Sequence, residues 1–340
     1  MEMVAEEVTK ALEKCFILIP YHNEGAKIIP LLNSLRYSVL SDYHRIEVIF
    51  IGDFPDKFTT EIVNKWIKKL PFKCYHLLNT ERNGKRFALW FAIEKYGLYG
   101  TKVVTMDADT YFHPLFLEKL YDVITSQNHD FIQIPVLIYE RGHGFIGDAQ
   151  VVEFSGIAFL NNLLNNFNLQ FISQGACMSF KPSKELKNHL FSLRYPYGDD
   201  MFIMQYFHRK GEINFVAERG LFILTRPVTK ISDFYKQRIR WLYKMEVKKF
   251  PLITLLGLLT WFVQIAYIYL AFKYPFIFLL LIIFEAVLFF RVMDALGVSY
   301  RGFISDINSF LRGRIAMTLL YLPIPVIMAI EKLRSRGRYN

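Results

Sequence analysis

The stretch Lys102-Val-Val-Thr-Met-Asp107-Ala-Asp109-Thr110 is an apolar run that delivers two carboxylates, one residue apart, into a turn ending at Pro114. In a strand, residues i and i+2 point to the same face, so an extended backbone would let both aspartates reach one cation. Carboxylate oxygens suit Mg²⁺ or Mn²⁺. Taken by itself, Asp-x-Asp also fits a solvated turn that caps a helix starting near Pro114.

Strand-like apolar runs alternate with stretches of helical periodicity through the first half of the chain. This alternation predicts βαβ units and an α/β fold with a mainly parallel sheet flanked by helices. The expected strands are residues 15–19, 46–51, 72–78, 102–106 and 131–138, and the expected helices include residues 28–40, 58–70 and 151–167.

Polar side chains follow three of the expected strands. Asn23 and Glu24 follow the first, Asp53 follows the second, and the Asp107 and Asp109 pair follows the fourth. The carboxyl ends of parallel strands meet at one edge of a sheet, where ligands bind, so a nucleotide-type ligand is expected there. A turn role for Asp53 beside Gly52 and a helix-capping role for Asn23 are the alternatives.

Composition divides the chain. Of its 340 residues, 53% are apolar and the net charge is +10; the apolar excess lies after residue 250, and basic residues cluster at 230–249 and 332–338. We predict a cytosolic domain at 1–245 and a membrane region at 246–340, with the basic clusters facing a cytoplasmic lipid surface. No nucleic-acid-binding motif is present, the three cysteines lack metal-ligand spacing, and residues 1–14 do not read as a signal peptide.

Two apolar runs, residues 252–272 and 274–290, are long enough to cross a hydrocarbon core of about 30 Å. A third, residues 315–330, is shorter and contains Pro323 and Pro325. Basic residues flank it on both sides, which favours a re-entrant or interfacial hairpin. A third true span is the alternative and would place the basic tail outside.

Three further segments carry candidate site residues. Small residues around Gly175, in a loop leading to a short strand, would let a bulky ligand approach the backbone. Asp199 and Asp200 introduce an apolar helix, which one of them could instead cap. Gln237, Arg240 and Trp241 lie on neighbouring helical turns just before the membrane region, where Trp241 could alternatively be an interfacial anchor.

The order of these motifs resembles a known family over residues 15 to 245. It resembles the family-2 inverting glycosyltransferases, in particular the membrane-bound branch with cellulose, chitin and hyaluronan synthases and ceramide glucosyltransferase. The resemblance implies a nucleotide-diphospho-sugar transferase fold of the GT-A type. The motifs are Ile19-Pro20-Tyr21-His22-Asn23-Glu24, Asp53, Asn83-Gly84-Lys85-Arg86, Asp107-Ala-Asp109, Gly198-Asp199-Asp200 and Gln237-Arg-Ile-Arg240-Trp241.

The resemblance also implies residue roles. Asp53 would contact the nucleoside, Lys85 would lie near the base and diphosphate, and Asp107 and Asp109 would hold the diphosphate and its Mg²⁺ or Mn²⁺. Asp200 would be the general base, with Asp199 beside it in place of the family's usual glutamate. Gln237, Arg240 and Trp241 would close over the diphosphate and the acceptor, and the substrate-binding set also includes Pro20, Asn23, Glu24 and Gly175.

Two departures from the family stand out. Gly52-Asp53-Phe54-Pro55 replaces the frequent Asp-Asp-Gly-Ser, which puts the nucleoside contacts in question. No amino-terminal span, such as several polymer synthases have, precedes the first strand.

The favoured function is a multi-pass enzyme of the cell membrane, metal-dependent and inverting, that moves sugar from a nucleotide donor to a lipid-linked or glycan acceptor at the cytoplasmic face. The alternative is a processive polysaccharide synthase coupled to export, for which two or three spans are few unless an oligomer or a membrane partner supplies the rest. A membrane-anchored binding protein without catalysis would be expected to lack Asp107, Asp109 or Asp200, and all three are present.

Overall fold

The computed structural model describes residues 14–138, 144–193, 198–244, 251–298 and 303–336. The chain forms two compact units, one of residues up to 136 together with 173–225, the other of residues 137–172 together with those from 226 onward. Each unit has its own core and is described by itself. The expected boundary at residue 245, between a cytosolic domain and a membrane region, stays a prediction.

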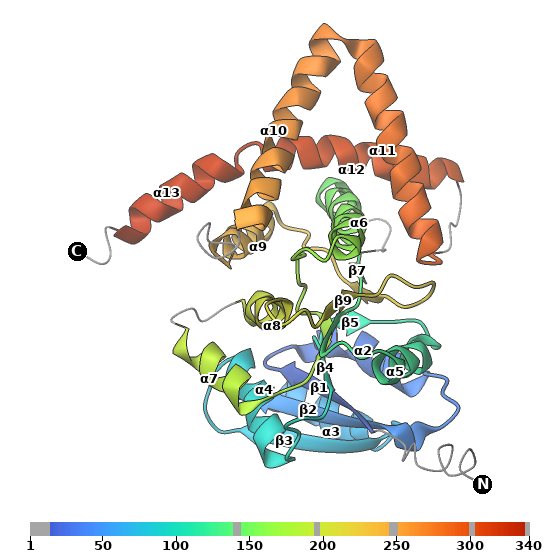
Figure 1. Ribbon diagram of the computed structural model, residues 1–340, viewed down its shortest axis with the longest axis vertical. Helices are drawn as coiled ribbons and strands as arrows, with labels where there is room; N and C mark the ends of the chain where they lie inside the picture. Colours follow the sequence, from blue (N-terminus) through green and yellow to red (C-terminus); the bar gives the residue numbers. More distant parts are fainter. Residues whose placement is uncertain (1–13, 139–143, 194–197, 245–250, 299–302, 337–340) are drawn as a thin grey trace. The chain divides into compact units, whose positions relative to one another are not determined.

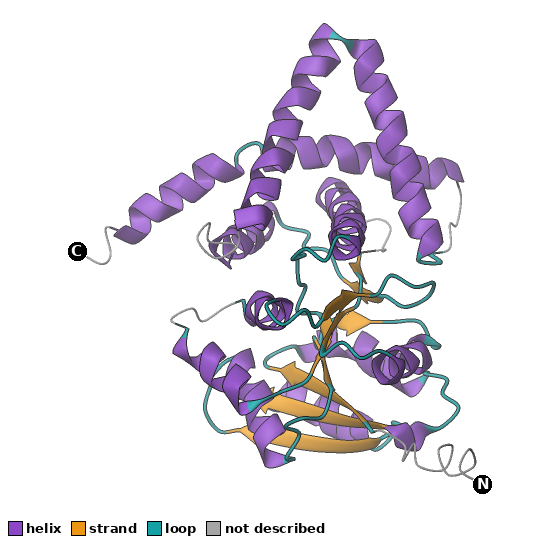
Figure 2. Cartoon of the chain, viewed as in Figure 1, coloured by secondary structure: helices purple, strands orange, loops and turns teal. Residues whose placement is uncertain are grey.

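A seven-stranded sheet forms the centre of the first unit (Figures 1 and 2). Its order is β3-β2-β1-β4-β8-β6-β9, and every neighbouring pair is parallel except those that β8 makes with β4 and β6. The strands are β1 (Cys15–Tyr21), β2 (Ile46–Asp53), β3 (Lys73–Asn79), β4 (Val103–Met106), β6 (Phe131–Gln133), β8 (Cys177–Phe180) and β9 (Ile213–Phe215). The predicted α/β fold with a mostly parallel sheet is confirmed.

The strand order reverses direction beside β1. The chain runs from β1 to β2 on one side, whereas β4 pairs with the other side of β1. In open α/β sheets, ligands bind beyond the carboxyl ends of the strands at such a switch point. The ends of β1 and β4, which carry Glu24 and Asp107 just beyond them, border this place.

The expected single strand at 131–138 is wrong in extent. It divides into β6 and β7 (Val136–Leu137), which belong to different sheets. Pro135 lies between them, and proline has no N–H to continue a ladder. The second sheet has the order β5-β10-β7, where β5 is Thr110–Tyr111 and β10 is Ile223–Thr225.

Helices connect the strands of the first unit. α4 packs against β1 and β2, while α3 packs on β3 and on η1. Asp56 caps α3 by accepting from Thr59 N–H at 2.6 Å, and Ser183 caps α7 by accepting from Leu186 N–H at 3.0 Å. These helices are η1 (Gly25–Ile28), α2 (Ile29–Arg36), η2 (Tyr43–Arg45), α3 (Lys57–Ile67), α4 (Lys85–Lys95), α5 (Phe116–Ser126), α7 (Lys184–Ser192) and α8 (Asp199–His208).

A buried carboxylate ties the edge of this sheet together. Glu47 of β2 accepts from Lys14 at 2.6 Å and from the hydroxyl of Tyr75 at 2.9 Å, and pairs with Lys73 at 3.5 Å. Burial opposes ionisation of Glu47, but these hydrogen bonds and positive charges outweigh it and lower its pKa.

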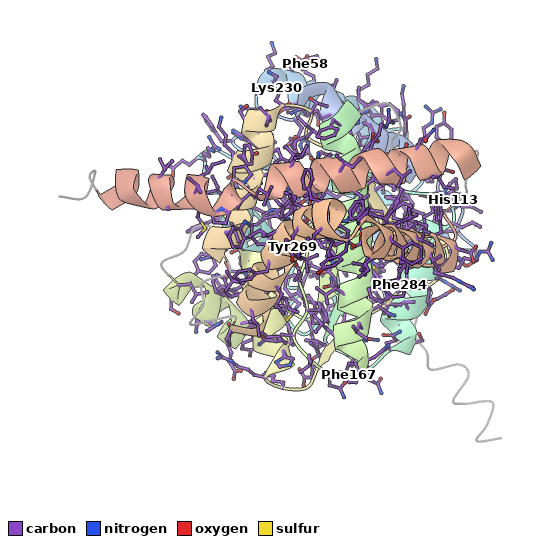
Figure 3. All side chains as sticks on the ribbon, turned by 90° about the horizontal axis from the view of Figure 1, so that it is seen from above. Phe58, His113, Phe167, Lys230, Tyr269 and Phe284 are labelled. Atoms are coloured by element: carbon purple, nitrogen blue, oxygen red, sulfur yellow. The ribbon has the colours of Figure 1, made fainter. Side chains whose placement is uncertain are left out.

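The second unit is helical. It contains α6 (Gly144–Asn166), α9 (Ile231–Lys244), α10 (Pro251–Lys273), α11 (Pro275–Ala295), α12 (Phe303–Tyr321) and α13 (Ile324–Arg336). The expected helix at 151–167 is longer in the structure and begins earlier, at Gly144. α10 and α11 meet at one end and diverge, and their outer faces carry exposed apolar side chains, among them Tyr269 and Phe284 (Figures 1 and 3).

Three helical segments are long and apolar enough to cross a membrane: Pro251–Lys273, Pro275–Ala295 and Asp306–Ile330. The first two correspond to the two predicted spans. The third contains the expected hairpin region, where a turn at 322–323 separates α12 from α13. By length and composition, Asp306–Ile330 is therefore a candidate for the alternative of a third true span.

Several polar side chains of these segments pair with one another inside the unit. Arg314 of α12 donates to Glu285 of α11 at 2.6 Å and to Gln264 of α10 at 2.8 Å, and its guanidinium lies 3.9 Å from the Tyr267 ring centroid. Charged groups in apolar segments need such partners. This network joins three helices of the unit.

Candidate active site

The exit of β1 is tied to the exit of β2. His22 Nδ1 lies 2.7 Å from the backbone oxygen of Asp53, and Asn23 Oδ1 accepts from Asp56 N–H at 2.7 Å. Pro20 is buried in β1 opposite Ile51. Asn23 therefore links two loops and does not cap a helix.

Asp53 organises the loop before α4. Its two carboxylate oxygens accept from the N–H groups of Asn83 at 3.0 Å and Gly84 at 2.8 Å, and the residue is only 6% exposed. Gly84 takes φ +86°, which favours glycine, and immediately precedes α4. The expected nucleoside contact of Asp53 stays a prediction, but its observed role is to fix this loop.

Lys85, the first residue of α4, lies between two other elements. Its ammonium donates to the Asp107 carboxylate and, at 2.9 Å, to the carbonyl oxygen of Gly175. Burial acts to lower the pKa of Lys85, but the charge and hydrogen bond of Asp107 outweigh it and raise that pKa. Lys85 is therefore charged and holds the end of β4 beside the loop that precedes β8.

Asp107 and Asp109 lie in a turn, so the expectation that an extended strand aligns them is wrong. β4 ends at Met106, and the Asp107 carbonyl accepts from Thr110 N–H at 3.3 Å and from its hydroxyl at 2.7 Å. The two carboxylates nevertheless interact. Although Asp109 reaches solvent, its partial burial, followed by the negative charges of Asp107 and Glu24, raises its pKa to about 6.

Glu24 belongs to the same negative cluster. Burial raises the pKa of Glu24, the charge of Lys27 opposes the rise, and the charge of Asp107 adds to it. Among the described residues, no group of three or more His, Cys, Asp or Glu side chains stands close enough to hold a metal ion. Two carboxylates still suit a divalent cation that takes its other oxygens from phosphate and water, and a cation would relieve the repulsion that raises the Asp109 pKa.

Gly175 joins the Lys85 contact to Asp200. Its N–H donates to Asp200 Oδ2 at 3.1 Å, while its carbonyl accepts from Lys85. A Cβ at Gly175 would lie 3.3 Å from the Cβ of Asp200, so glycine permits this approach. The buried side chain of Gln133 holds the loop by donating to the Gln174 and Cys177 carbonyls at 3.1 and 2.8 Å.

Asp199 has a different partner from Asp200. The Arg86 guanidinium donates to Asp199 Oδ1, with Nε at 2.7 Å and Nη2 at 2.5 Å, and to the Leu190 carbonyl at 2.7 Å. Burial raises the pKa of Asp199, the charge of Arg86 opposes the rise, and the charge of Asp200 adds to it. Asp199 is thus held by an arginine, and Asp200 accepts from the Gly175 N–H.

The remaining predicted residues lie on α9 in the second unit. Arg240 is exposed, and the half-buried ring of Trp241 packs against Phe154 with ring centroids 6.0 Å apart. Gln237 accepts from Arg238. Arg238 is 3% exposed, forms an ion pair with Glu153, and places its guanidinium 4.8 Å from the Trp241 ring centroid.

Within the first unit, contacts or charge interactions connect Glu24, Lys85, Asp107, Asp109, Gly175, Asp199 and Asp200. Arg86, Gln133 and Arg238 were assigned no role from sequence. Arg86 could have been considered, because it adjoins Lys85 in the recognised motif. Arg238 likewise lies between Gln237 and Arg240 in the recognised motif, whereas Gln133 carries no such signal, since it acts through contacts with residues distant in the chain.

The sheet with its switch-point carboxylates is that of a GT-A-type α/β glycosyltransferase. The sequence model of Glycosyl transferase family group 2 matches residues 102–330, and that of Glycosyl transferase family 2 matches residues 16–186. Because each match covers half of the chain or more, the chain belongs to the family 2 glycosyltransferases, enzymes that use nucleotide-sugar donors. No curated protein matches the chain in sequence.

Solved structures resemble the chain more remotely. The mannosyltransferase PcManGT of Pyrobaculum calidifontis, in complex with GDP-mannose and Mn²⁺, shares 14% identity at a TM-score of 0.45, covering 95% of this chain and 80% of that one. Residues 1–349 of S. aureus TarS with UDP-GlcNAc share 16% identity at a TM-score of 0.44, covering 92% and 90%. At these scores the family assignment rests on the two sequence models.

Proposed function

We propose that the protein is a metal-dependent, inverting glycosyltransferase of the membrane-bound branch of family 2. It transfers a sugar from a nucleotide-diphosphate donor to a lipid-linked or glycan acceptor at the cytoplasmic face of the cell membrane. The observation that carries this proposal is the contact series from Asp107 through Lys85 and Gly175 to Asp200. In this series the Lys85 ammonium and the Asp107 carboxylate, which suit a diphosphate and its cation, are linked through Gly175 to the Asp200 carboxylate, which can act as a base.

Asp200 takes the proton from the acceptor hydroxyl in this mechanism. The acceptor oxygen attacks the anomeric carbon from the face opposite the diphosphate, the bond from that carbon to the diphosphate oxygen breaks, and the configuration inverts. The Gly175 N–H orients the Asp200 carboxylate during this step. The Lys85 ammonium neutralises negative charge on the leaving diphosphate.

A divalent cation belongs to the proposed site. Asp107 and Asp109 would hold Mg²⁺ or Mn²⁺, which supplies further charge stabilisation to the diphosphate when bound. The roles of Gln237, Arg240 and Trp241 in closing over the diphosphate and the acceptor rest on their motif. Within the second unit, the pairing of Arg238 with Glu153 and Trp241 gives that motif a fixed support.

The three apolar helical segments support membrane association and an acceptor at the lipid surface.

The test of this function incubates membranes that contain the protein with radiolabelled UDP- and GDP-sugars in Mg²⁺ or Mn²⁺. We expect label in an organic-extractable lipid, whereas label in a high-molecular-weight polymer would identify the processive alternative. Asp200→Asn should abolish transfer, and full transfer by this variant would refute the base assignment.

A further inference from the structure

We propose that the second half of α6 and the turn after it, residues 156–169, lie on the surface of the lipid bilayer as an interfacial segment. In sequence this segment is far from the three candidate spans and inside the region expected to be cytosolic. The structure instead groups residues 137–172 with those from 226 onward, the unit in which the candidate spans lie. This lipid contact is separate from the spans and does not depend on the sugar-transfer reaction.

Large apolar side chains of the segment are exposed. Phe159 is 40% exposed, Leu163 42%, Phe167 67% and Leu169 40%. Phe159, Leu163 and Phe167 follow one another at intervals of four residues, which places them along one side of α6 and its end. An exposed apolar surface of this kind marks a site of interaction.

The exposed face continues the one by which α6 contacts the apolar helices. Val152 lies seven residues before Phe159 and therefore on the same face of α6. It packs against a buried cluster with one member each from α10, α11 and α12, namely Tyr267, Ile282 and Phe310. Phe167 lies at the end of α6 away from the crossing with α12 (Figure 3). The first half of α6 thus packs on the apolar helices, and the second half leaves the same face exposed.

The composition of the segment suits a lipid surface. Between Glu153 and Lys181 the sequence has no Asp, Glu, Lys, Arg or His, although 21% of the whole chain is charged. Charged side chains resist transfer into lipid, whereas Phe and Leu are the side chains with which interfacial helices enter the boundary between headgroups and acyl chains. Among the described helices, α6 is not one of the candidate spans. The segment therefore lies along the membrane surface and does not cross it.

Backbone hydrogen bonds hold the turn that carries Phe167 and Leu169. Asn168 adopts φ +53°, and its N–H donates to the Asn165 carbonyl at 2.9 Å. The N–H of Leu169 donates to the Leu164 carbonyl, also at 2.9 Å. A left-handed residue with these two bonds is a regular way to end a helix. The two apolar side chains are therefore presented on a fixed turn and not on a frayed end.

The test measures how close single fluorophores on the full chain lie to lipid. Leu163→Cys and Phe167→Cys are each labelled with an NBD fluorophore in a Cys74→Ser background, because Cys74 is half-buried while Cys15 and Cys177 are buried. The labelled proteins are reconstituted in nanodiscs of phosphatidylcholine and phosphatidylglycerol, with or without a nitroxide on the acyl chains. Emission falls where the nitroxide reaches the fluorophore.

We expect the nitroxide lipid to lower the emission of both labels by about twofold or more, because these side chains enter the boundary of the acyl chains. Leu258→Cys on α10, in a candidate span, is the positive control. Phe58→Cys on α3 is the matched control, because Phe58 is 60% exposed and belongs to the first unit. The nitroxide lipid should leave its emission unchanged, and iodide in the water should quench it. Phe159→Cys is the second variant if a label at the other positions prevents folding.

Quenching by the nitroxide lipid at Leu258 but at none of the α6 positions would overturn this lipid contact alone. A blue-shifted emission at Leu163 and Phe167 without lipid quenching would assign the surface to protein, such as a second copy of the chain, and would also overturn it. Absence of quenching at Leu258 as well would overturn both the contact and the membrane part of the proposed function. Quenching in a protein that transfers no sugar would support the contact and refute the proposed reaction.

Discussion

Replacing Asp53 with asparagine tests whether this residue reads the nucleoside or fixes the loop before α4. Its two oxygens accept from Asn83 and Gly84 N–H at 3.0 and 2.8 Å. Asparagine retains one acceptor oxygen, while its amide group brings an N–H toward a backbone N–H. One charge-assisted hydrogen bond is lost and the remaining one becomes neutral.

The size of the effect follows from that loss. A hydrogen bond to a charged group contributes about 1.5–3 kcal/mol. In the variant, the loop must return to its position before Lys85 can contact the donor. The free energy of the lost hydrogen bond then adds to the activation barrier and lowers kcat/KM by about 10- to 150-fold. The loss should be the same for every nucleoside diphosphate, since the loop fixes Lys85 and not the base.

The assay measures kcat/KM for the working donor and inhibition constants for UDP, GDP and ADP. A loop role predicts that all three inhibitors weaken together, within about threefold of one another, for Asp53→Asn. Asp42→Asn is the control, since Asp42 accepts from His44 N–H at 2.9 Å in the cap of η2, which carries none of the predicted site residues. A change of about tenfold or more in the preference among UDP, GDP and ADP would refute the loop role and establish a nucleoside contact.

Four further predictions concern charge, metal, packing and pH. Lys85→Met should lower kcat/KM by about 100-fold or more, because the donor end loses its fixed cation; steady-state release of nucleoside diphosphate measures this. Chelation with EDTA should abolish transfer and added Mn²⁺ or Mg²⁺ should restore it, and activity that persists in EDTA would contradict a metal at Asp107. Gly313→Ala would place a Cβ 2.3 Å from the Asp148 carbonyl oxygen, so α6 and α12 must separate at a cost of about 3 kcal/mol, seen as a lower melting temperature in detergent. Glu47→Gln should remove an acid-sensitive contribution to stability. The folded pKa of Glu47 lies below its ordinary value of 4.5, so its stabilisation is present above that pH and is lost as pH falls through the folded pKa; denaturant melts at pH 7 and pH 3 should differ less in the variant.

Periodicity was sufficient for the first four strands of the sheet and insufficient for β9 and for the turn after β4. The apolar runs located β1 to β4, because buried parallel strands are continuous apolar segments. The expected strand at 102–106 ends at Met106, as β4 does, but local pattern did not show that the Asp107 carbonyl then accepts from Thr110. The carboxylate pair was recognised by residue type, while its geometry depends on a turn whose hydrogen bonds are not encoded by alternation.

Residue identity also indicated which side chains carry charge in the site, but not which of them bind one another. Asp199 and Asp200 are indistinguishable by composition, and only the fold brings Arg86 to one and the Gly175 N–H to the other. These contacts span 113 and 25 residues of chain. Such pairings follow from the path of the backbone between elements, which local propensity does not determine.

The site depends on backbone amides as much as on side chains, and this decides what substitutions reveal. Gly84 N–H holds Asp53, and Gly175 N–H holds Asp200 while the carbonyl of Gly175 holds Lys85. A carboxylate that accepts from a backbone N–H is restrained in one orientation before the donor arrives. Loss of either loop therefore misplaces a charged side chain without removing it, and kinetics that resemble loss of a catalytic group can arise from residues that never touch the sugar.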